Sequence, residues 1–588
     1  PQLEGSEMPK QLFLATLLSS GLALTASAVD VKSSRRPSDV VEREALGVVR
    51  VDVHERLYPD RWPRPAEPGP ISVPRGVPVT LQFAVRAKAK GAAQLSLTGN
   101  VSGKPRLHWL QSVHVEGNTQ GSLKNRPGGA VPKGWMDHLV RAAPFDTLEV
   151  LVESNRMPMD PGRTHGVVLE ITVPRDAKPG THEGALRVTL GNDEAVAPFT
   201  YRVHGTALPD PLPIHSVHWL WAQPFNLTNG KIPEWWSERH WQLLETAGKQ
   251  LRRFGDDTVY TPLVNYRQPL IQITRREDGT FAFDYSRFDR WGKLFLGLGF
   301  RYLSGHHVIN LMHVHMGGTF VIDEATGKKE PLLKDVKDRA AWLAFLPSFY
   351  DSLHAHLKEK GWLGNYLQCQ YDEPRDVGLY KRLTALARKH LPGVPTIDAI
   401  NSARQDVFSP LVDMQVFNLI GLNRYQKVAA QRNAKGKGVW LYHCTSPYPP
   451  HPNRHIDCYL TESRLYPWLC HKLGANGFLF WGANIYRGAD EYKTSIGPFP
   501  NGSQDPGHPP GDSWFYYRSP EGLRPSIRIV SFREGLIDYA LLTMLAERDP
   551  DTVEKLVAKV APSIRRFERD PVTYHQARAA ILEALDKP

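Results

Sequence analysis

The sequence predicts a multidomain protein in which an N-terminal all-β sandwich precedes a (β/α)8 TIM-type barrel and a short helical C-terminal tail. The chain has 588 residues, more than one hydrophobic core accommodates. Residues 30–206 alternate apolar and polar side chains with period two, which is typical of half-buried strands. From about residue 215, short apolar runs alternate with helical segments, which indicates a parallel sheet with crossover helices.

The N-terminus carries an export signal. Met8-Pro9-Lys10 is a short positive segment, Leu12 to Leu24 is apolar, and Ala26-Ser27-Ala28 fits a cleavage site, so we expect a secreted or periplasmic protein. A proline-rich stretch, 208–213, breaks secondary structure and marks a domain boundary. The predicted divisions are a signal peptide (1–28), a sandwich (29–206), a linker (207–214), a barrel (215–548) and a tail (549–588).

Within the sandwich, Leu81, Phe83 and Val85 alternate with polar or small residues, and Leu169, Ile171 and Val173 do the same. In the barrel we expect eight strands near 215–221, 257–262, 301–306, 365–371, 395–400, 413–418, 438–443 and 477–482. The helices expected include 237–253, 336–360, 376–390, 461–474 and 526–547, with hairpin insertions at 269–284 and 319–332.

Composition excludes several classes of function. The formal net charge is +11, but the basic residues are dispersed and no nucleic-acid motif occurs, so no nucleic-acid partner is expected. No further stretch approaches ~18 apolar residues, so no integral membrane span is expected. The four cysteines show no CxxC zinc spacing; whether Cys444 and Cys458 form a disulfide stays open, as does the oligomeric state.

The most informative segment is Gln370-Tyr371-Asp372-Glu373-Pro374, at the predicted end of strand four. Barrel enzymes keep their catalytic groups at the carboxyl ends of strands, and paired carboxylates are typical of glycoside hydrolysis. Alternation predicts Leu367, Cys369 and Tyr371 on the helix side, with Gln368, Gln370 and Asp372 pointing into the barrel. The structural alternative is that Asp372 and Glu373 only begin a helix, with Pro374 at its first position.

The segment from about 365 to 540 resembles glycoside hydrolase family 123, the exo-acting β-N-acetylgalactosaminidases and their relatives. The most family-like stretch is Pro525-Ser526-Ile527-Arg528 with Arg533-Glu534-Gly535-Leu536-Ile537-Asp538-Tyr539. The other matching residues are Tyr371-Asp372-Glu373-Pro374, Trp440-Leu441-Tyr442, Pro452-Asn453, Ile456-Asp457, Glu462, Arg464, Trp468, Gly474 through Gly477, Phe480-Trp481 and Asn484. Tyr486 departs from the family, where tryptophan is more usual, and the loop 486–512 is longer than expected.

The resemblance implies a substrate-assisted retaining mechanism without a cofactor. The 2-acetamido oxygen of the substrate would attack the anomeric carbon and form an oxazolinium ion. Asp372 would hold the acetamido N–H, and Glu373 would act as general acid and then as general base. The partner is therefore a glycan or oligosaccharide with a terminal β-linked N-acetylgalactosamine or a related sugar.

Further substrate-binding candidates lie at the predicted strand ends: His306, His307, Asn418, Tyr442, Trp481 and Asn484. Tyr442 is a candidate for the acetamido carbonyl and Trp481 for a pocket wall. His313 and His315 form an HxH pair, but no carboxylate-rich cluster accompanies them, so no metal is expected.

Two alternatives stay open at this level. A retaining glycosidase acting on a sugar without the acetamido group would need a separate nucleophile, for which Asp398 at strand five is the candidate. A non-catalytic glycan-binding surface protein would not need an acid at position 373. The sequence leaves the choice of sugar, the linkage, the acceptance of sulfated glycans and any glycan binding by the sandwich undetermined.

Overall fold

The computed structural model describes residues 45–264, 268–309, 319–335, 338–497 and 507–587. The predicted signal peptide and the pair His313 and His315 lie outside these residues. Among the helices that the structure does describe, none has the length and hydropathy needed to cross a membrane.

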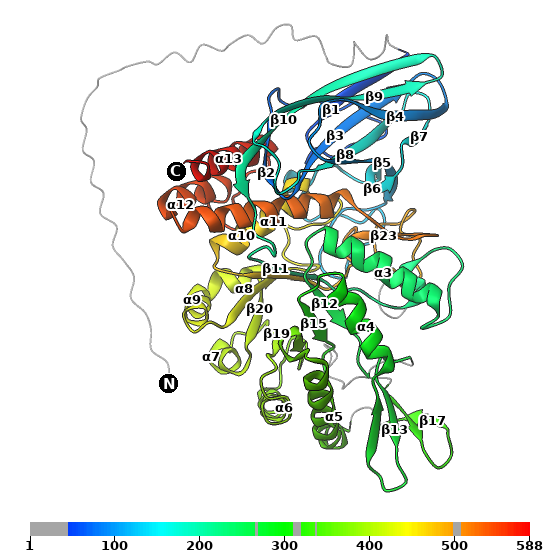
Figure 1. Cartoon of the computed structure of the whole chain (residues 1–588), viewed down its shortest axis with the longest axis vertical. Coiled ribbons are helices and arrows are strands. Elements are labelled where there is room, and N and C mark those ends of the chain that lie inside the picture. The colour runs from blue at the N-terminus through cyan, green and yellow to red at the C-terminus, as the bar shows by residue number, and fades with distance from the viewer. Residues whose placement is uncertain (1–44, 265–267, 310–318, 336–337, 498–506, 588) are drawn as a thin grey trace, which may run out of the picture. The chain divides into compact units, whose positions relative to one another are not determined.

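The N-terminal region is a sandwich of two five-stranded sheets, in the orders β1-β3-β8-β5-β6 and β2-β10-β9-β4-β7 (Figure 1). The alternating runs used for prediction lie side by side, with Leu81 opposite Leu169 and Phe83 opposite Val167, and all four side chains are buried. The bounds are β1 Leu46–Val51, β2 Ile71–Arg75, β3 Pro78–Ala87, β4 Gly91–Gly99, β5 Lys104–Val115, β6 Phe145–Glu153, β7 Arg156–Met159, β8 Thr164–Thr172, β9 Gly180–Leu190 and β10 Asp193–Ala207.

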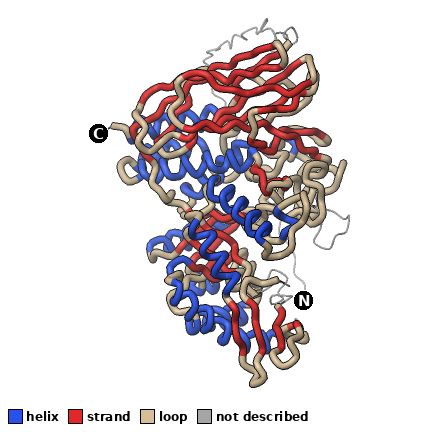
Figure 2. The backbone as a smooth tube through the Cα atoms, turned by 45° about the vertical axis from the view of Figure 1, so that its right-hand side comes forward, coloured by secondary structure: helices blue, strands red, loops and turns tan. Residues whose placement is uncertain are grey.

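The second region, called the β/α domain here, contains eight short parallel strands, each inside its predicted range. They are β11 His215–His218, β12 Thr258–Thr261, β15 Tyr302–Gly305, β18 Tyr366–Gln368, β19 Ile397–Ala399, β20 Met414–Asn418, β21 Gly438–Tyr442 and β22 Gly477–Phe480. Figure 2 shows these strands in red with helices in blue around them. The two predicted hairpins also form, and they join into one sheet of order β14-β13-β16-β17, which the sequence did not predict.

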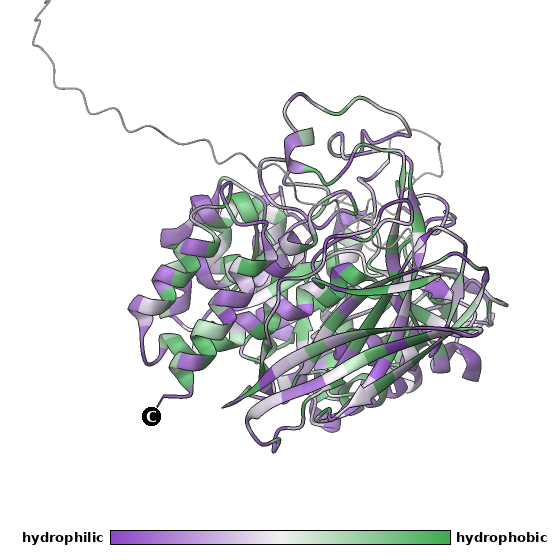
Figure 3. Ribbon diagram, turned by 90° about the horizontal axis from the view of Figure 1, so that it is seen from above, coloured by the Kyte–Doolittle hydropathy of each residue, from purple (hydrophilic) through white to green (hydrophobic). Residues whose placement is uncertain are grey.

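The hairpin strands are β13 Gln272–Arg275, β14 Phe281–Asp284, β16 Phe320–Asp323 and β17 Lys329–Pro331, and a further hairpin consists of β23 Tyr516–Ser519 and β24 Gly522–Pro525. The α-helices are α2 Pro224–Leu227, α3 Glu238–Arg253, α4 Ser286–Gly297, α5 Arg339–Lys360, α6 Val377–His390, α7 Gln405–Phe408, α8 Leu419–Arg424, α9 Gln426–Ala434, α10 Leu460–Lys472, α11 Ile527–Ala546, α12 Pro550–Val560 and α13 Pro571–Leu585. In Figure 3, hydrophobic and hydrophilic residues alternate along strands and helices, as expected for elements with one buried face.

The sheet topology does not show the predicted closed barrel. The eight strands form a five-stranded sheet, β11-β22-β21-β20-β19, and a three-stranded sheet, β12-β15-β18. At the gap between β11 and β12, side-chain carboxylates take the place of backbone carbonyls as hydrogen-bond acceptors. The Ser216 N–H donates to Asp257 (3.1 Å) and the His218 N–H donates to Asp256 (3.2 Å). One backbone bond remains, from Asp257 N to Ser216 O (3.0 Å).

The gap between β18 and β19 has the same cause. A single bridge joins Gln368 to Thr396. Beyond it, the Asp398 carboxylate accepts the backbone N–H groups of Gln370 (2.8 Å) and Tyr371 (3.1 Å), which a regular ladder would have used. Side-chain acceptors therefore satisfy the backbone where the sheet is interrupted.

The predicted facing of strand four is wrong for Leu367, Cys369 and Gln370. Leu367 and Cys369 lie in an interior cluster between the strands (Val217, Trp219, Tyr260, Leu367, Cys369, Ile397, Ala399, Val416, Trp440, Tyr442 and Leu479). Gln370 faces the helices instead and accepts a hydrogen bond from Tyr350 of α5 (3.1 Å). Tyr371 also packs on the helix side, so two consecutive residues face outward. If alternation restarts after them, Asp372 faces inward, which stays a prediction.

A buried charge network joins the sandwich to helices α10, α11 and α13, and Figure 1 shows α11 and α13 against the sandwich. Glu149 of β6 accepts from Arg528 of α11 (2.5 Å) and from Arg56 (3.1 Å). Further along α11, Asp538 accepts from Arg464 of α10 and from Arg578 of α13, both at 2.6 Å. These ion pairs and the surrounding core hold the two regions in one compact unit.

Candidate active site

Asp372 and Glu373 form a tight turn after β18. Glu373 has a φ of 48°, which is the left-handed region that side chains other than glycine rarely adopt. Hydrogen bonds hold the turn on both sides, from Asp372 N to Ile309 O (3.0 Å) and from Glu373 N to Ala399 O (3.1 Å). Such strain is typical of functional sites. The two residues do not begin a helix, because α6 starts at Val377 with Asp376 as its N-cap.

Glu373 has a tyrosine as its hydrogen-bond partner rather than a cation. The hydroxyl of Tyr442, at the end of β21, donates to Glu373 Oε1 at 2.5 Å. Burial raises the pKa of the Glu373 carboxyl; the Tyr442 hydroxyl opposes this rise, the Asp372 charge adds to it, and Arg375 opposes it. A carboxyl with a raised pKa keeps its proton to higher pH, as a general acid requires.

Asp398, the candidate for a separate nucleophile, is engaged elsewhere. Its side chain is 1% exposed. Besides the two backbone N–H groups of the strand-four end, it accepts a hydrogen bond from Tyr380 of α6 at 2.8 Å. This carboxylate therefore supports the backbone that leads to Glu373, and its remaining neighbour is His307, whose Nε2 lies 3.8 Å away.

His306 and His307 lie in an aromatic stack below the site. Tyr260 stacks on Trp219 (4.2 Å between centroids) and on His306 (4.0 Å), and its hydroxyl lies 3.0 Å from His307 Nδ1. Burial lowers the pKa of His307 to about 3 and that of His306 well below its ordinary value, so both rings stay neutral. The two histidines are therefore uncharged, and their part in binding a sugar stays a prediction.

The two asparagine candidates differ. Asn484 is fully buried, accepts from Trp221 N (2.9 Å) and donates to the carbonyls of Trp221 (3.1 Å) and Asn226 (2.9 Å). Both amide hydrogens and one acceptor site of Asn484 are used by the backbone, so this geometry does not favour the prediction that it binds a sugar hydroxyl. Asn418 caps α8 by accepting from Gly421 N (2.6 Å), and it lines a pocket at the ends of β19 to β21.

Trp481 follows β22 and is half-buried beside the interior cluster. Its ring lies 5.1 Å from that of His508, and the Arg487 guanidinium lies 5.7 Å from its centroid. The sequence did not single out His508 or Arg487, because both lie in the long loop after β22, where position carries no signal. That the Trp481 ring forms a pocket wall stays a prediction.

Two groups of side chains among the described residues have metal-ligand spacing: Asp52, His54 and His575, and His455, Asp457 and Cys458. In the first, Asp52 bridges the two histidines, at 3.1 Å from His54 Nδ1 and 2.7 Å from His575 Nε2. In the second, Asp457 accepts the hydroxyl and the backbone N–H of Thr119. Hydrogen bonds within the protein account for the first arrangement and for the position of Asp457 in the second. The four cysteines are unbridged.

Comparison with known proteins found one family model and similar solved structures. The family model described as Glycoside hydrolase 123, catalytic domain, matches residues 221–545. A family 123 glycoside hydrolase from Clostridium perfringens, studied for glycolipid glycan hydrolysis, aligns with a TM-score of 0.71 at 17% identity, over 91% of this chain and 98% of that chain. No curated protein matches the sequence.

More distant structures share only limited similarity. A GH10 xylanase with a bacterial Ig-like domain from termite gut aligns at a TM-score of 0.30 and 10% identity, over 63% of this chain and 90% of its own. A β-galactosidase from Marinomonas ef1 aligns at 0.33 and 10% identity, over 59% and 62% of the two chains.

Proposed function

Since the chain belongs to glycoside hydrolase family 123, we propose that it removes terminal β-linked N-acetylgalactosamine, or a related 2-acetamido sugar, from glycans by substrate-assisted retaining catalysis. One observation carries the proposal: the strained Glu373 turn holds a carboxyl of raised pKa beside Asp372 and against the Tyr442 hydroxyl. Adjacent carboxyls suit a mechanism in which the nucleophile belongs to the substrate. The eight strands would act as one (β/α)8 barrel with this site at their carboxyl ends.

In the first step, the acetamido oxygen attacks the anomeric carbon, while Glu373 transfers its proton to the departing glycosidic oxygen. Asp372 accepts the acetamido N–H and balances the positive charge of the oxazolinium ion. In the second step, the Glu373 carboxylate takes a proton from the water that attacks the anomeric carbon, and the acetamido group is restored. Both displacements invert the anomeric centre, so the product keeps the β configuration.

The substrate to try first is a glycan from a glycolipid, because the similar Clostridium perfringens enzyme was studied for glycolipid glycan hydrolysis. A glycosidase without an acetamido requirement loses support, because its candidate nucleophile is engaged by Tyr380 and by backbone groups. We also propose that residues 8–28 direct export, which N-terminal sequencing of the mature secreted protein would test.

The test is nitrophenol release from the β-glycosides of N-acetylgalactosamine, N-acetylglucosamine and galactose, with wild type and Asp372→Asn. Turnover of acetamido sugars only, reduced a hundredfold or so in the variant, supports the proposal. The exposed Asp406→Asn is the matched control and should behave as wild type. Comparable turnover of the galactoside, or a first product of α configuration by NMR, would reject the mechanism.

A further inference from the structure

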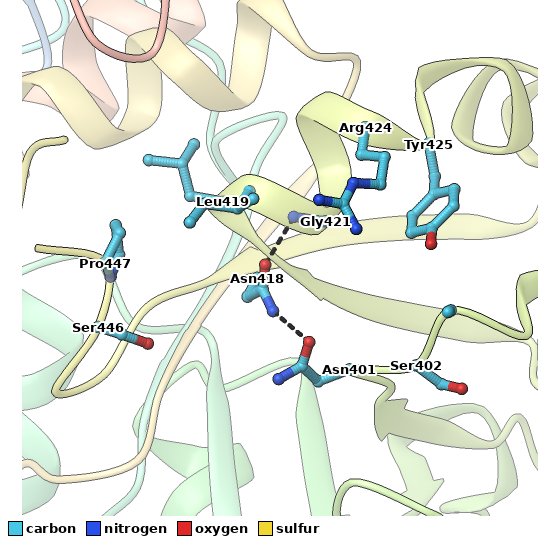
Figure 4. Close-up of a pocket in the computed structure, with 11 residues that line it drawn as sticks. Asn401, Ser402, Asn418, Leu419, Gly421, Arg424, Tyr425, Ser446 and Pro447 are labelled. Carbon is cyan, nitrogen blue, oxygen red and sulfur yellow. Dashed lines mark hydrogen bonds between the residues drawn. The ribbon is translucent and has the colours of Figure 1, made fainter. Parts of the chain in front are cut away.

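A pocket of about 320 Å³ opens beside the Glu373–Tyr442 pair, at the carboxyl ends of β19, β20 and β21. Its lining residues are Asn401, Ser402, Ala403, Asn418, Leu419, Ile420, Gly421, Arg424, Tyr425, Ser446 and Pro447. Figure 4 shows Arg424 and Tyr425 on one side, Ser446 and Pro447 on the other, and the hydrogen-bonded Asn401 and Asn418 between them.

The backbone fixes where the pocket lies relative to the catalytic groups. Asn401 follows Ala399, whose carbonyl accepts the Glu373 N–H, by two residues. Asn418 pairs in the sheet with Tyr442, the tyrosine that donates to Glu373. The pocket therefore adjoins the site on the side of the general acid. Because a general acid protonates the departing oxygen, this is the side on which the leaving group lies, an assignment that rests on the proposed function.

The chemistry of the lining favours an anion. Arg424 is the one charged residue in this lining, and within the described part of the chain its guanidinium makes no hydrogen bond or ion pair. The Asn401 side-chain oxygen accepts from Asn418 (2.6 Å), which leaves its amide N–H groups to face the pocket. Ser402 and Ser446 add hydroxyls, and no carboxylate lines the pocket.

The rest of the lining suits a sugar ring. Leu419, Ile420, Tyr425 and Pro447 provide apolar surface, and Ile420 is 41% exposed although it is a large aliphatic residue. Pockets with apolar walls and a few convergent polar donors are typical of small-ligand sites. An arginine in such a wall matches the planar, bidentate geometry of carboxylate and sulfate oxygens.

We propose that this pocket holds the sugar next to the cleaved bond and that Arg424 binds an anionic substituent on that sugar, either a sulfate ester or a carboxylate. The chain would then act preferentially on acidic glycans, with the terminal 2-acetamido sugar recognised at Asp372 and the acidic neighbour recognised at Arg424.

The test compares three oligosaccharides with β-linked N-acetylgalactosamine on lactose: the neutral trisaccharide, the trisaccharide sulfated on the galactose, and the tetrasaccharide sialylated on the galactose. Wild type should show kcat/KM about tenfold or more higher for at least one anionic substrate than for the neutral one. Arg424→Gln should bring this ratio close to one, and added salt should lower it in wild type. Lys427→Gln, an exposed cation three residues along, should keep the wild-type ratio.

A preference for the neutral trisaccharide, or a ratio unchanged in Arg424→Gln, would overturn the proposal while the proposed activity stands. If wild type hydrolyses no terminal N-acetylgalactosaminide, the proposed function fails, and the pocket assignment is then tested by measuring sugar binding directly. Calorimetric titration with lactose 3′-sulfate, 3′-sialyllactose and lactose should show that an anionic sugar binds more tightly than lactose and that Arg424→Gln abolishes this difference. Equal affinity for all three sugars would overturn the pocket assignment. Tight binding of lactose 3′-sulfate alone would identify the sulfate ester as the group that Arg424 binds. Tight binding of 3′-sialyllactose alone would identify the carboxylate.

Discussion

The carboxylates of the network that joins the two regions and the carboxylates at the strand ends lie in opposite electrostatic surroundings. Glu534 of α11 belongs to the same network, because it accepts a hydrogen bond from Arg578 (2.7 Å). Burial alone would raise the pKa of Glu534 and Asp538, but the neighbouring arginines outweigh it and lower both pKa values to about 2. At the strand ends, the hydrogen-bond partner of Glu373 is the hydroxyl of Tyr442, and burial raises the pKa of the Glu373 carboxyl. The same type of side chain therefore stabilises the fold in one place and holds an exchangeable proton in the other.

The largest effect expected is on activity, from Glu373→Gln. Loss of the general acid should reduce kcat/KM on the nitrophenyl N-acetylgalactosaminide about 10²–10⁴-fold. Because the folded state raises the pKa of Glu373, ionising this carboxyl destabilises the fold above its unfolded-state pKa, and that penalty is absent below it. The variant should thus unfold at the same or a higher temperature than wild type at neutral pH. Retained activity would show that the acid lies elsewhere.

Next in size is a loss of stability from Asp538→Asn. The carboxylate accepts from Arg464, Arg578 and Trp468 (2.9 Å for the indole) and is fully buried. Its removal leaves the buried Arg464 without a carboxylate partner, while Arg578 keeps Glu534, and should destabilise the protein by about 3–5 kcal/mol. Urea unfolding followed by tryptophan fluorescence measures this, and Asp551→Asn, an exposed neighbour in α12, is the control, expected within about 0.5 kcal/mol.

The pH dependence of the free energy of unfolding tests the same contribution of Asp538. Because the folded-state pKa of Asp538 lies at about 2 against an ordinary 3.8, its stabilisation is present above pH 3.8 and is lost as the pH falls toward 2. Wild type should therefore lose stability across this window, and Asp538→Asn should lose less. An identical acid dependence in both proteins would show that the ion pairs contribute little.

Sequence reasoning located the strands and the Glu373 turn because period and strand-end position carry physical information. It misplaced Leu367 and Cys369, because Asp398 binds two successive N–H groups and shifts the alternation, which depends on a contact 27 residues away in the chain. It missed Arg424 and Ser446 of the pocket, since Arg424 ends the six-residue helix α8 and Ser446 lies in a loop, and neither segment is long enough or regular enough to show a periodicity.

The most family-like stretch teaches a related lesson. Arg528 and Asp538 belong to the buried charge network and not to the candidate active site at the strand ends. A strong family signal therefore marks the residues that fix the two regions together, while the site itself contributes only a short motif. The interruption of the predicted barrel could not be read from the sequence, because it depends on local hydrogen bonds from the strand backbone to the side chains of Asp256 and Asp257.

An intermediate effect is expected for Tyr442→Phe. The hydroxyl donates to the Glu373 carboxylate and so favours its charged form. Without it, the pKa of Glu373 should rise further, and the alkaline limb of the kcat/KM profile, where the acid loses its proton, should move to higher pH. Tyr459→Phe, on α10's N-terminal side, is the control. A shift to lower pH would mean that the tyrosine acts on another group.

The smallest effects separate the two asparagines that the sequence treats alike. Asn484→Ala leaves backbone groups of Trp221 and Asn226 without partners in the interior and should lower stability by about 1–3 kcal/mol, with KM for the nitrophenyl substrate unchanged.

Asn418→Ala removes the N-cap of α8, which should lower stability by about 1 kcal/mol, and it removes one polar side chain of the pocket wall, so it should raise KM for the lactose-based oligosaccharides. Thermal unfolding and steady-state kinetics on both variants distinguish the roles. A KM increase in Asn484→Ala alone would return that residue to the substrate site and assign the Asn418 pocket no part in binding.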